Sequence, residues 1–216
     1  NRLLEGGVHG IFALGTTGEA PSLDANLKRQ MIERVCKMVN GKVPVLAGIT
    51  DTSFTESVKL ADYAANCGAS ALVLAPPYYF PAGQPEFLEY IGHLAERLPL
   101  PLMLYNMPAM TKVQLEPETV RQALEIQGVI GMKDSSGNMV YFHKVRQLLG
   151  EKIRDVSLFV GPEELLAEAV LMGADGGVSG GANVFPSLYV RLYEAALRHD
   201  MKRMTDLHCK VIRLGQ

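Results

Sequence analysis

The chain is poor in cysteine. Its 216 residues include only Cys36, Cys67 and Cys209, an odd number of widely spaced thiols with no C-x-x-C pair. This usage excludes a disulfide framework and a cysteine zinc site, and it is typical of a reducing compartment. We therefore expect a cytoplasmic protein.

The chain also lacks an excess of charge and any long hydrophobic run. Its net charge is −2, with acidic and basic residues interspersed, so no basic stripe is present to attract nucleic acid or an anionic membrane. The longest apolar runs, near residues 71–80 and 98–105, are too short and too rich in proline to span a bilayer. We expect neither nucleic acid nor a membrane as a partner.

Sequence motifs for common cofactors are missing too. The turn Gly15-Thr16-Thr17-Gly18-Glu19 matches neither the G-x-G-x-x-G fingerprint of dinucleotide sites nor a Walker loop. No histidine stands at the carboxyl end of a predicted strand, so ligands for a catalytic metal do not converge there. The sequence predicts a protein with no metal and no cofactor.

What the chain does have is a repeated alternation of short aliphatic runs with amphipathic helical segments. One helical face is predicted from Leu27, Met31, Val35 and Met38, and another from Phe87, Ile91, Leu94 and Leu98. Such alternation predicts a parallel sheet. The predicted strands are residues 8–15, 43–50, 71–77, 101–107, 129–133, 157–161 and 177–180.

The chain shows seven strand–helix units, and residues 1–6 look like the end of a helix that has no strand before it in this sequence. This pattern favours a (β/α)8 barrel over an open sheet. The first strand of that barrel would lie before Asn1. We expect one barrel over residues 1–199, and the start of a C-terminal helical extension over residues 200–216.

The most informative stretch is Gly128–Gly137, a buried apolar run that ends in Lys133. A charged ammonium in such a strand costs several kcal/mol, so the amine is driven toward its neutral form, which can attack a carbonyl. Alternatively, Lys133 forms a structural ion pair with Asp134 at the exposed end of the strand.

In a barrel, the carboxyl ends of the strands share one rim. That rim would hold Tyr78, Tyr79, Tyr105 and the Thr16-Thr17 hydroxyls beside Lys133. An amine with a phenol and a hydroxyl suits imine chemistry on a 2-oxo acid, with proton relay through the phenol and donors for the carboxylate. The alternatives are loop packing for the tyrosines and an ordinary turn for the threonines.

Four strings, GTTGE, PPYY, YNMP and GMKDSSG, follow one another on successive strands. In this order they resemble the dihydrodipicolinate synthase and N-acetylneuraminate lyase family of class I aldolases, over nearly the whole chain. The resemblance implies a (β/α)8 barrel, a lysine imine with pyruvate or another 2-oxo acid, an aldehyde as second substrate, and a homotetramer built from tight dimers.

The resemblance also implies residue roles. Lys133 is similar to the imine lysine, Tyr105 to the relay tyrosine and Thr16 to the relay hydroxyl. Thr17 would help to hold the carboxylate, and Tyr79 matches a tyrosine that reaches into the neighbouring subunit's site. Residues that would lie near the substrate are Ser135, Gly161, Glu163 and Val178.

Departures from the family pattern bear on the substrate. Met110 stands where the synthase branch has a carboxylate-binding arginine. A methionine cannot bind a carboxylate, so this position argues against a synthase unless Lys112 takes the place of the arginine. Glu163 and Glu164 stand where the sialic acid lyase branch has an Asp-Glu pair, and Ser135 replaces a threonine. We therefore expect a metal-independent lyase or aldolase that cleaves hydroxylated 2-oxo acids. The alternatives are a dihydrodipicolinate synthase and a barrel that binds an oxo acid without turnover.

Overall fold

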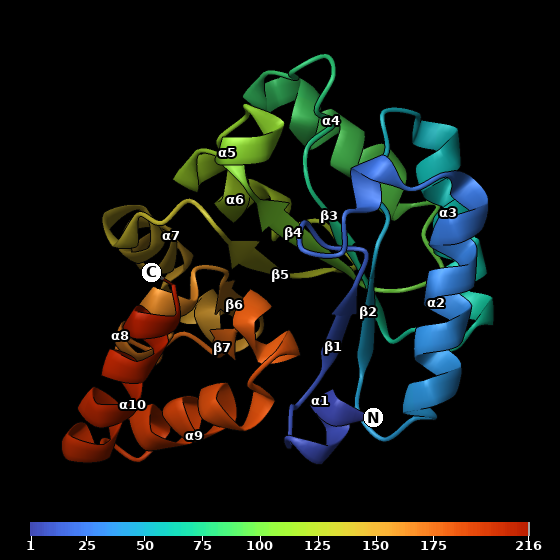
Figure 1. Cartoon of the computed structure of the whole chain (residues 1–216). Coiled ribbons are helices and arrows are strands. Elements are labelled where there is room, and N and C mark those ends of the chain that lie inside the picture. Colours follow the sequence, from blue (N-terminus) through green and yellow to red (C-terminus); the bar gives the residue numbers. More distant parts are fainter. Residues whose placement is uncertain (216) are drawn as a thin grey trace.

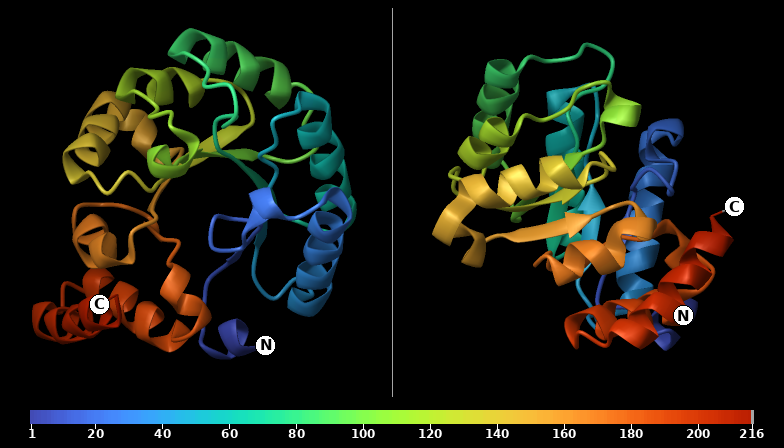
Figure 2. Two further views of the ribbon diagram at one scale, coloured as in Figure 1. Left: turned by 45° about the horizontal axis from the view of Figure 1, so that its top comes forward. Right: turned by 90° about the vertical axis from the view of Figure 1, so that its left-hand side faces the viewer.

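A computed structural model describes residues 1–215 of the chain. Its centre is one parallel sheet of seven strands, hydrogen-bonded in the order in which they occur along the chain. Figure 2 shows the sheet curled into an arc, with helices on its outer side. The strands are β1 (Ile11–Ala13), β2 (Val45–Gly48), β3 (Ala71–Leu74), β4 (Leu102–Asn106), β5 (Val129–Asp134), β6 (Ser157–Val160) and β7 (Gly176–Gly177).

This arrangement is a half-barrel. Strands β1 and β7 are the two edges of the sheet, and no strand among the described residues joins them. The parallel α/β class predicted from the sequence is confirmed, whereas a closed barrel is not formed by residues 1–215. Figure 1 shows the N-terminal helix α1 (Arg2–Glu5) near β1, on one side of this opening, and helix α9 (Pro186–Leu197) on the other.

Residues typical of helix caps lie at the ends of several helices. Ser53 Oγ accepts from the amide of Glu56 at the start of α3, and Gly68, with φ +88, follows the end of that helix. The remaining helices are α2 (Ala25–Val39), α3 (Phe54–Asn66), α4 (Gln84–Ala95), α5 (Pro108–Thr111), α6 (Pro117–Ala123), α7 (Met139–Leu149), α8 (Leu166–Leu171) and α10 (Met201–Leu214), with short 3₁₀ turns η1 (Ala20–Ser22), η2 (Gly150–Arg154), η3 (Glu163–Leu165) and η4 (Gly180–Asn183).

All the strands except β5 are shorter than predicted, and the first and the last show why. The strand predicted at residues 8–15 is paired only over Ile11–Ala13, because Leu14 has a left-handed backbone with φ +61. The last strand, predicted at 177–180, is observed at Gly176–Gly177, and Gly180 instead begins η4.

Two apolar layers stabilise the sheet. The larger packs the outer face of the sheet against the helices and contains Phe87, Ile91 and Phe142, all fully buried. The smaller lies on the concave face and contains Val73, Met103 and Tyr105, with Phe12 and Phe159 against them. The concave layer is where the site lies.

The predicted apolar face of α2 is wrong. Its buried residues are Lys28, Ile32, Cys36 and Val39, whereas Leu27, Met31 and Met38 are between 44% and 49% exposed. The 3.6-residue period was real, but the stripe that faces the sheet lies one residue further along the helix. The apolar face predicted for α4 is confirmed at Phe87, Ile91 and Leu94.

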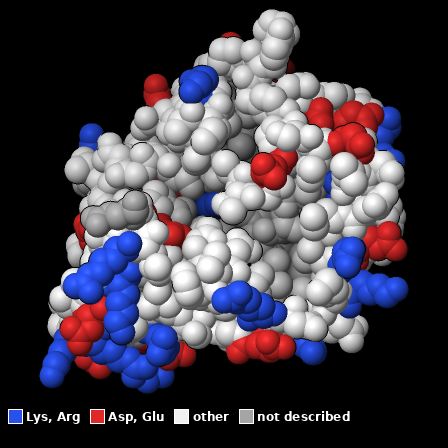
Figure 3. Space-filling model, in the orientation of Figure 1, with Lys and Arg blue, Asp and Glu red and all other residues white. Residues whose placement is uncertain are grey.

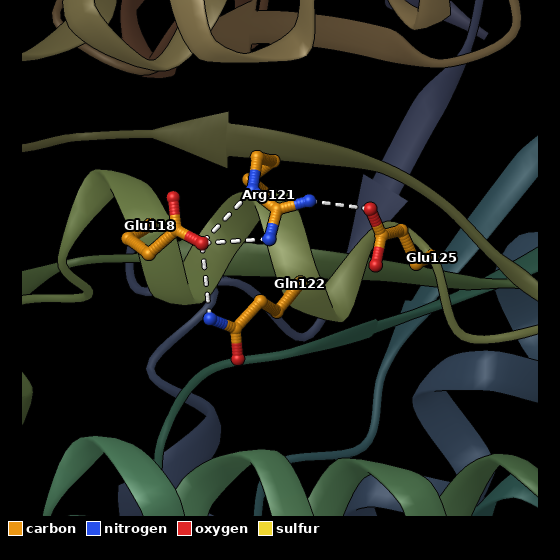
Figure 4. Close-up of polar contacts among 4 residues, drawn as sticks. All are labelled: Glu118, Arg121, Gln122 and Glu125. Atoms are coloured by element: carbon orange, nitrogen blue, oxygen red, sulfur yellow. Dashed lines mark hydrogen bonds and ion pairs between the residues drawn. The ribbon is translucent and has the colours of Figure 1, made fainter.

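The outer surface carries short-range ion pairs away from the strand ends. On α6, Arg121 binds Glu118 at 2.7 Å and also pairs with Glu125, as Figure 4 shows. The hydrogen bond from Arg121 lowers the pKa of Glu118 to about 2. Among the described residues, no helix is both long and apolar enough to cross a membrane.

The end of the chain forms a helical pair. Helices α9 and α10 pack together around Leu192, Leu207 and Val211, in an apolar cluster that also includes Leu166 and Val170 of α8. Residue 216, the last of the predicted extension, lies outside the described residues. The division at residue 199 stays a prediction.

Candidate active site

Strand alternation places Lys133 on the concave face. Along β5, Gly131 and Lys133 share one face, while Met132 packs in the outer core. Parallel register sets Tyr105 of β4 and Phe159 of β6 directly beside Lys133. The three side chains therefore form one layer across neighbouring strands.

The amine of Lys133 is buried against aromatic rings. Its Nζ lies 4.2 Å from the ring centroid of Tyr105 and 5.1 Å from that of Phe12, and the residue is 7% exposed. Of the residues that the structure describes, none places a carboxylate oxygen within 4.0 Å of this nitrogen. Burial lowers the pKa of Lys133, and Tyr105 opposes that shift only in part.

The buried lysine on α2 provides a contrast. Lys28 is also 7% exposed, but its Nζ lies 3.3 Å from the carboxylate of Asp51. Lys28 therefore has the usual arrangement for a buried cation, and Lys133 does not. A lysine that is buried without a carboxylate is the kind that serves as a nucleophile.

The alternative in which Lys133 pairs with Asp134 does not fit the geometry. Asp134 accepts from Asn106 Nδ2 at 2.8 Å and from the amide and hydroxyl of Ser136. Asn106 in turn accepts from the amide of Leu115 at 3.1 Å. Burial raises the pKa of Asp134, and its hydrogen bonds work in the opposite direction.

A hydroxyl and a phenol meet above the amine. Thr16 Oγ1 and Tyr105 Oη are 3.1 Å apart, and either atom can donate. The turn that carries Thr16 depends on the left-handed backbone of Leu14, and a Cβ on Gly48 of β2 would lie 2.3 Å from the carbonyl oxygen of Leu14. A glycine is needed at position 48 so that this carbonyl can approach.

Gly161, the residue that follows β6, lies close to the side chain of Lys133. A Cβ on Gly161 would lie 1.8 Å from Ser135 Oγ and 3.2 Å from Lys133 Cε. Val178, further along the rim, donates its amide to the carbonyl of Val160 at 2.9 Å. The structure thus brings Ser135 and Gly161 together with Lys133, as the sequence predicts.

Thr17 and Glu163 both lie beside Gly180 of η4. A Cβ on Gly180 would lie 3.2 Å from Thr17 Oγ1 and 4.0 Å from Glu163 Oε2. Both carboxylate oxygens of Glu163 already accept hydrogen bonds, from the amide of Gly181 and from Tyr189 Oη, at 2.7 Å each.

Two other predicted residues lie apart from the lysine. Tyr79 is 74% exposed and stacks edge to face on Phe80, which is 81% exposed. Met110 is 59% exposed, and the ammonium of nearby Lys112 donates to the carbonyl of Ala109 at 2.7 Å. No contact within the described chain assigns a role to Tyr79.

Sequence reasoning missed two residues that shape the site. Phe12 faces the lysine, and strand alternation from the buried Ala13 could have placed it on the concave side. Asn106, fully buried, bridges Asp134 to Leu115, and a polar residue directly after Tyr105 was the available signal.

The surface of one face is hollowed, and the walls of the hollow are mostly uncharged (Figure 3). The face drawn in Figure 3 is hollowed near its centre, and a small patch of Lys or Arg atoms lies inside the hollow. In residues 1–215, no three His, Cys, Asp or Glu side chains gather closely enough to hold a metal ion.

A family model, the dihydrodipicolinate synthetase family, matches residues 1–216 of the chain. The chain belongs to this family. The resemblance predicted from the sequence is thereby confirmed.

Curated relatives carry two kinds of name. A 4-hydroxy-tetrahydrodipicolinate synthase of Methanopyrus kandleri is 38% identical over 215 residues, covering 99% of this chain and 71% of the relative. A probable 2-dehydro-3-deoxy-D-pentonate aldolase of Escherichia coli is 33% identical, covering 98% of this chain and 71% of the relative. The family membership therefore supports a class I aldolase and is equally consistent with a synthase.

Solved structures share the fold. A dihydrodipicolinate synthase from Bacteroides thetaiotaomicron matches with a TM-score of 0.95 and 53% identity, covering 99% of this chain and 72% of that one. The family member YagE from Escherichia coli, in complex with pyruvate, matches with a TM-score of 0.93 and 28% identity, over 98% of this chain and 72% of that one.

Proposed function

We propose that this family member is a metal-independent class I carbon–carbon lyase in which Lys133 forms an imine with pyruvate or a pyruvate-derived 2-oxo acid. One observation carries the proposal: a buried amine faces two aromatic rings, lacks a carboxylate partner within 4.0 Å among the described residues, and has a phenol above it. Burial favours the neutral amine, which is the nucleophilic form.

The covalent step balances within this site. The lone pair of Lys133 Nζ attacks the keto carbon, and the carbonyl oxygen takes up protons and leaves as water. The substrate hydroxyl then gives up its proton, the bond between the α-carbon and the hydroxyl-bearing β-carbon breaks with its electron pair passing to the iminium, and the aldehyde departs. The enamine that remains takes up a proton at the α-carbon, and water hydrolyses the imine to release the second oxo acid and the free amine of Lys133. Tyr105 and Thr16, 3.1 Å apart, form the relay that carries the protons.

In this proposal, the turn after β1 binds the carboxylate of the 2-oxo acid. Thr16 and Thr17 present hydroxyls and amides there, and Ser135, Gly161 and Val178 line the opposite rim. Such donors at a turn suit the carboxylate of a 2-oxo acid. Glu163 lies beside the same turn, close to Gly180 of η4.

Cleavage of a hydroxylated 2-oxo acid is the favoured reaction, with the synthase reaction second. Met110 is apolar and cannot bind a second carboxylate, whereas the exposed Lys112 donates one of its three N–H groups to Ala109 and keeps its charge, so the preference for cleavage rests on Met110. The pentonate aldolase among the relatives supports cleavage, whereas the synthases among them favour condensation of pyruvate with an aldehyde. A barrel that binds an oxo acid without turnover would not need the Thr16–Tyr105 pair.

The assembly belongs to the same proposal. We infer a cytoplasmic homotetramer in which the exposed Tyr79 enters a neighbouring subunit's site, because a tyrosine and phenylalanine this exposed are typical of an interface. We also infer that the half-barrel is part of a closed (β/α)8 barrel, with an eighth strand between β1 and β7.

Reductive trapping tests the chemistry. Borohydride added with pyruvate is expected to add the mass of one reduced pyruvate at Lys133, located by peptide mass spectrometry. Lys133→Ala should abolish the adduct, whereas Lys28→Met, which removes an equally buried but paired lysine, should retain it. The absence of an adduct in the unmodified protein would end the imine proposal.

A second variant tests the relay. Tyr105→Phe keeps the ring over the amine but removes the hydroxyl, so we expect trapping to slow by about 10²–10⁴-fold while the final adduct remains at Lys133. Tyr141→Phe is the matched control, because Tyr141 is a buried phenol whose hydroxyl contacts Met132 Sδ on the other face of β5. Equal rates for the two variants would remove Tyr105 from the mechanism.

A further inference from the structure

Glu163 links three parts of the rim through its two carboxylate oxygens. It stands at the start of η3, just after β6; Oε2 accepts from the amide of Gly181 in η4, and Oε1 accepts from Tyr189 Oη in α9. Tyr189 is 5% exposed and Glu163 is partly buried. We call these three residues the Glu163 latch.

The Glu163 latch packs tightly against η4. A Cβ on Gly181 would lie 2.1 Å from Tyr189 Oη and 2.6 Å from Glu163 Oε1. A Cβ on the preceding residue, Gly180, would lie 3.2 Å from Thr17 Oγ1 and 4.0 Å from Glu163 Oε2. The turn is therefore held between the latch and the threonine that is proposed to bind the substrate carboxylate.

The charge of Glu163 makes its position matter. A carboxylate close to Thr17 would repel the carboxylate of a 2-oxo acid, since like charges at short range oppose each other. Glu163 Oε2 lies near the same side of Gly180 as Thr17, so the hydrogen bonds from Gly181 and Tyr189 are what hold the carboxylate in place and offset its charge. Without the phenol, Oε1 loses its partner and is free to turn toward Thr17.

We propose that Glu163 and Tyr189 are positioning residues that fix the Gly180–Gly181 turn beside Thr17 and keep the Glu163 carboxylate away from the 2-oxo acid. This inference rests on the proposed imine function of the site. It gives Glu163 a role through its neighbours rather than through contact with substrate, and it gives Tyr189, which the sequence did not single out, a share in substrate affinity.

The test measures how much pyruvate is needed for half-maximal borohydride trapping. Tyr189→Phe removes one charge-assisted hydrogen bond and is expected to raise this concentration by about fivefold or more, with the maximal trapping rate unchanged. Tyr193→Phe is the matched control on the same helix, because its hydroxyl donates to Asp175 O at 3.2 Å and not to η4. That control should behave as the unmodified protein does.

A charge-neutral variant separates positioning from simple loss of structure. Glu163→Gln keeps an acceptor for the amide of Gly181 but removes the negative charge, so the double variant Glu163→Gln/Tyr189→Phe should bring the half-saturating concentration back toward that of the unmodified protein. Thermal melting of each variant checks that it is folded. A general structural loss would worsen in the double variant instead.

The outcomes distinguish the two proposals. No adduct in the unmodified protein would overturn the imine function and this inference with it. Normal trapping, with Tyr189→Phe indistinguishable from Tyr193→Phe or with no recovery in the double variant, would overturn the positioning role alone.

Discussion

At the scale of single residues, burial of the Lys133 amine makes it more reactive and lowers the stability of the folded protein. Its amine is buried against the rings of Tyr105 and Phe12, so the protonated form is poorly solvated and the pKa is lowered from its ordinary value. Below the folded-state pKa the protein carries the full cost of that buried charge. The cost disappears as pH rises to the unfolded-state pKa, because both states are then neutral there.

Lys133→Leu is therefore expected to stabilise the protein. Below the folded-state pKa of Lys133 we expect a gain of about 0.5–2 kcal/mol in the free energy of unfolding, which declines to zero as the pH rises from there to the unfolded-state pKa. Urea unfolding at a series of pH values measures it. Lys112→Leu, at an exposed lysine, should show no such trend, and a Lys133→Leu gain that is independent of pH would contradict the explanation.

The lysine itself could be predicted from the sequence, but its surroundings could not. A charged residue at the end of an apolar run stands out in one dimension, whereas Phe12 lies more than a hundred residues away and meets it only through the curl of the sheet. The role of Glu163 has the same origin. Its carboxylate was visible in the sequence, but its bond to Tyr189 depends on how α9 packs against α8 and η4.

At the scale of elements, the ends of β4 and β5 act as one unit. Tyr105 lies opposite Lys133 and Asn106 lies opposite Asp134, so one register sets both the reacting pair and the buried polar pair behind it. Asn106 donates to Asp134 at 2.8 Å and accepts from Leu115. Buried polar groups of this kind hold a strand pair in register only while all partners are present.

Asn106→Ala should therefore weaken both fold and site. Two buried partners lose their hydrogen bonds, and we expect a loss of about 2–4 kcal/mol in urea unfolding. Borohydride trapping with pyruvate should also slow by at least about tenfold. Val145→Ala, which removes apolar volume from the buried side of α7, is the stability-matched control. Equal trapping by the two variants would show that the pair only stabilises the fold.

The order of the strands and helices could be predicted from the sequence. Which face of each helix packs against the sheet could be predicted only in part. Seven alternations predicted seven parallel strands in sequential order, because each run was short, apolar and bounded by turn residues. The face of α4 was also predicted, since its apolar stripe is single. Helix α2 carries two adjacent apolar stripes, and period alone cannot say which of them the sheet covers.

At the scale of the whole molecule, the second stripe of α2 bears on how the sheet closes. Arg29 and Glu33 face α3, where Tyr63 Oη donates to Glu33 at 3.2 Å and the guanidinium of Arg29 lies 5.9 Å from the ring of Tyr63. At 100° per residue, Leu27 and Met31 lie on the opposite flank of the helix, toward the free edge of β1. A closing strand–helix unit would cover that flank.

This closure predicts a coupled effect on stability. A chain lengthened by a designed strand–helix unit that pairs with β1 and β7 should melt several degrees higher than residues 1–216, because two open edges and the α2 stripe become buried. The pair of substitutions Leu27→Gln and Met31→Gln should change the present chain by no more than about 0.5 kcal/mol, since both side chains are exposed. In the lengthened chain the same pair should cost about 2–4 kcal/mol, because both side chains would then be buried.

Circular dichroism melting measures both, and a lengthened chain with proline in the middle of the added strand is the control. An equal cost in the two chains would show that the flank stays open, and the sheet would then have to be stabilised at that edge by something other than an eighth strand.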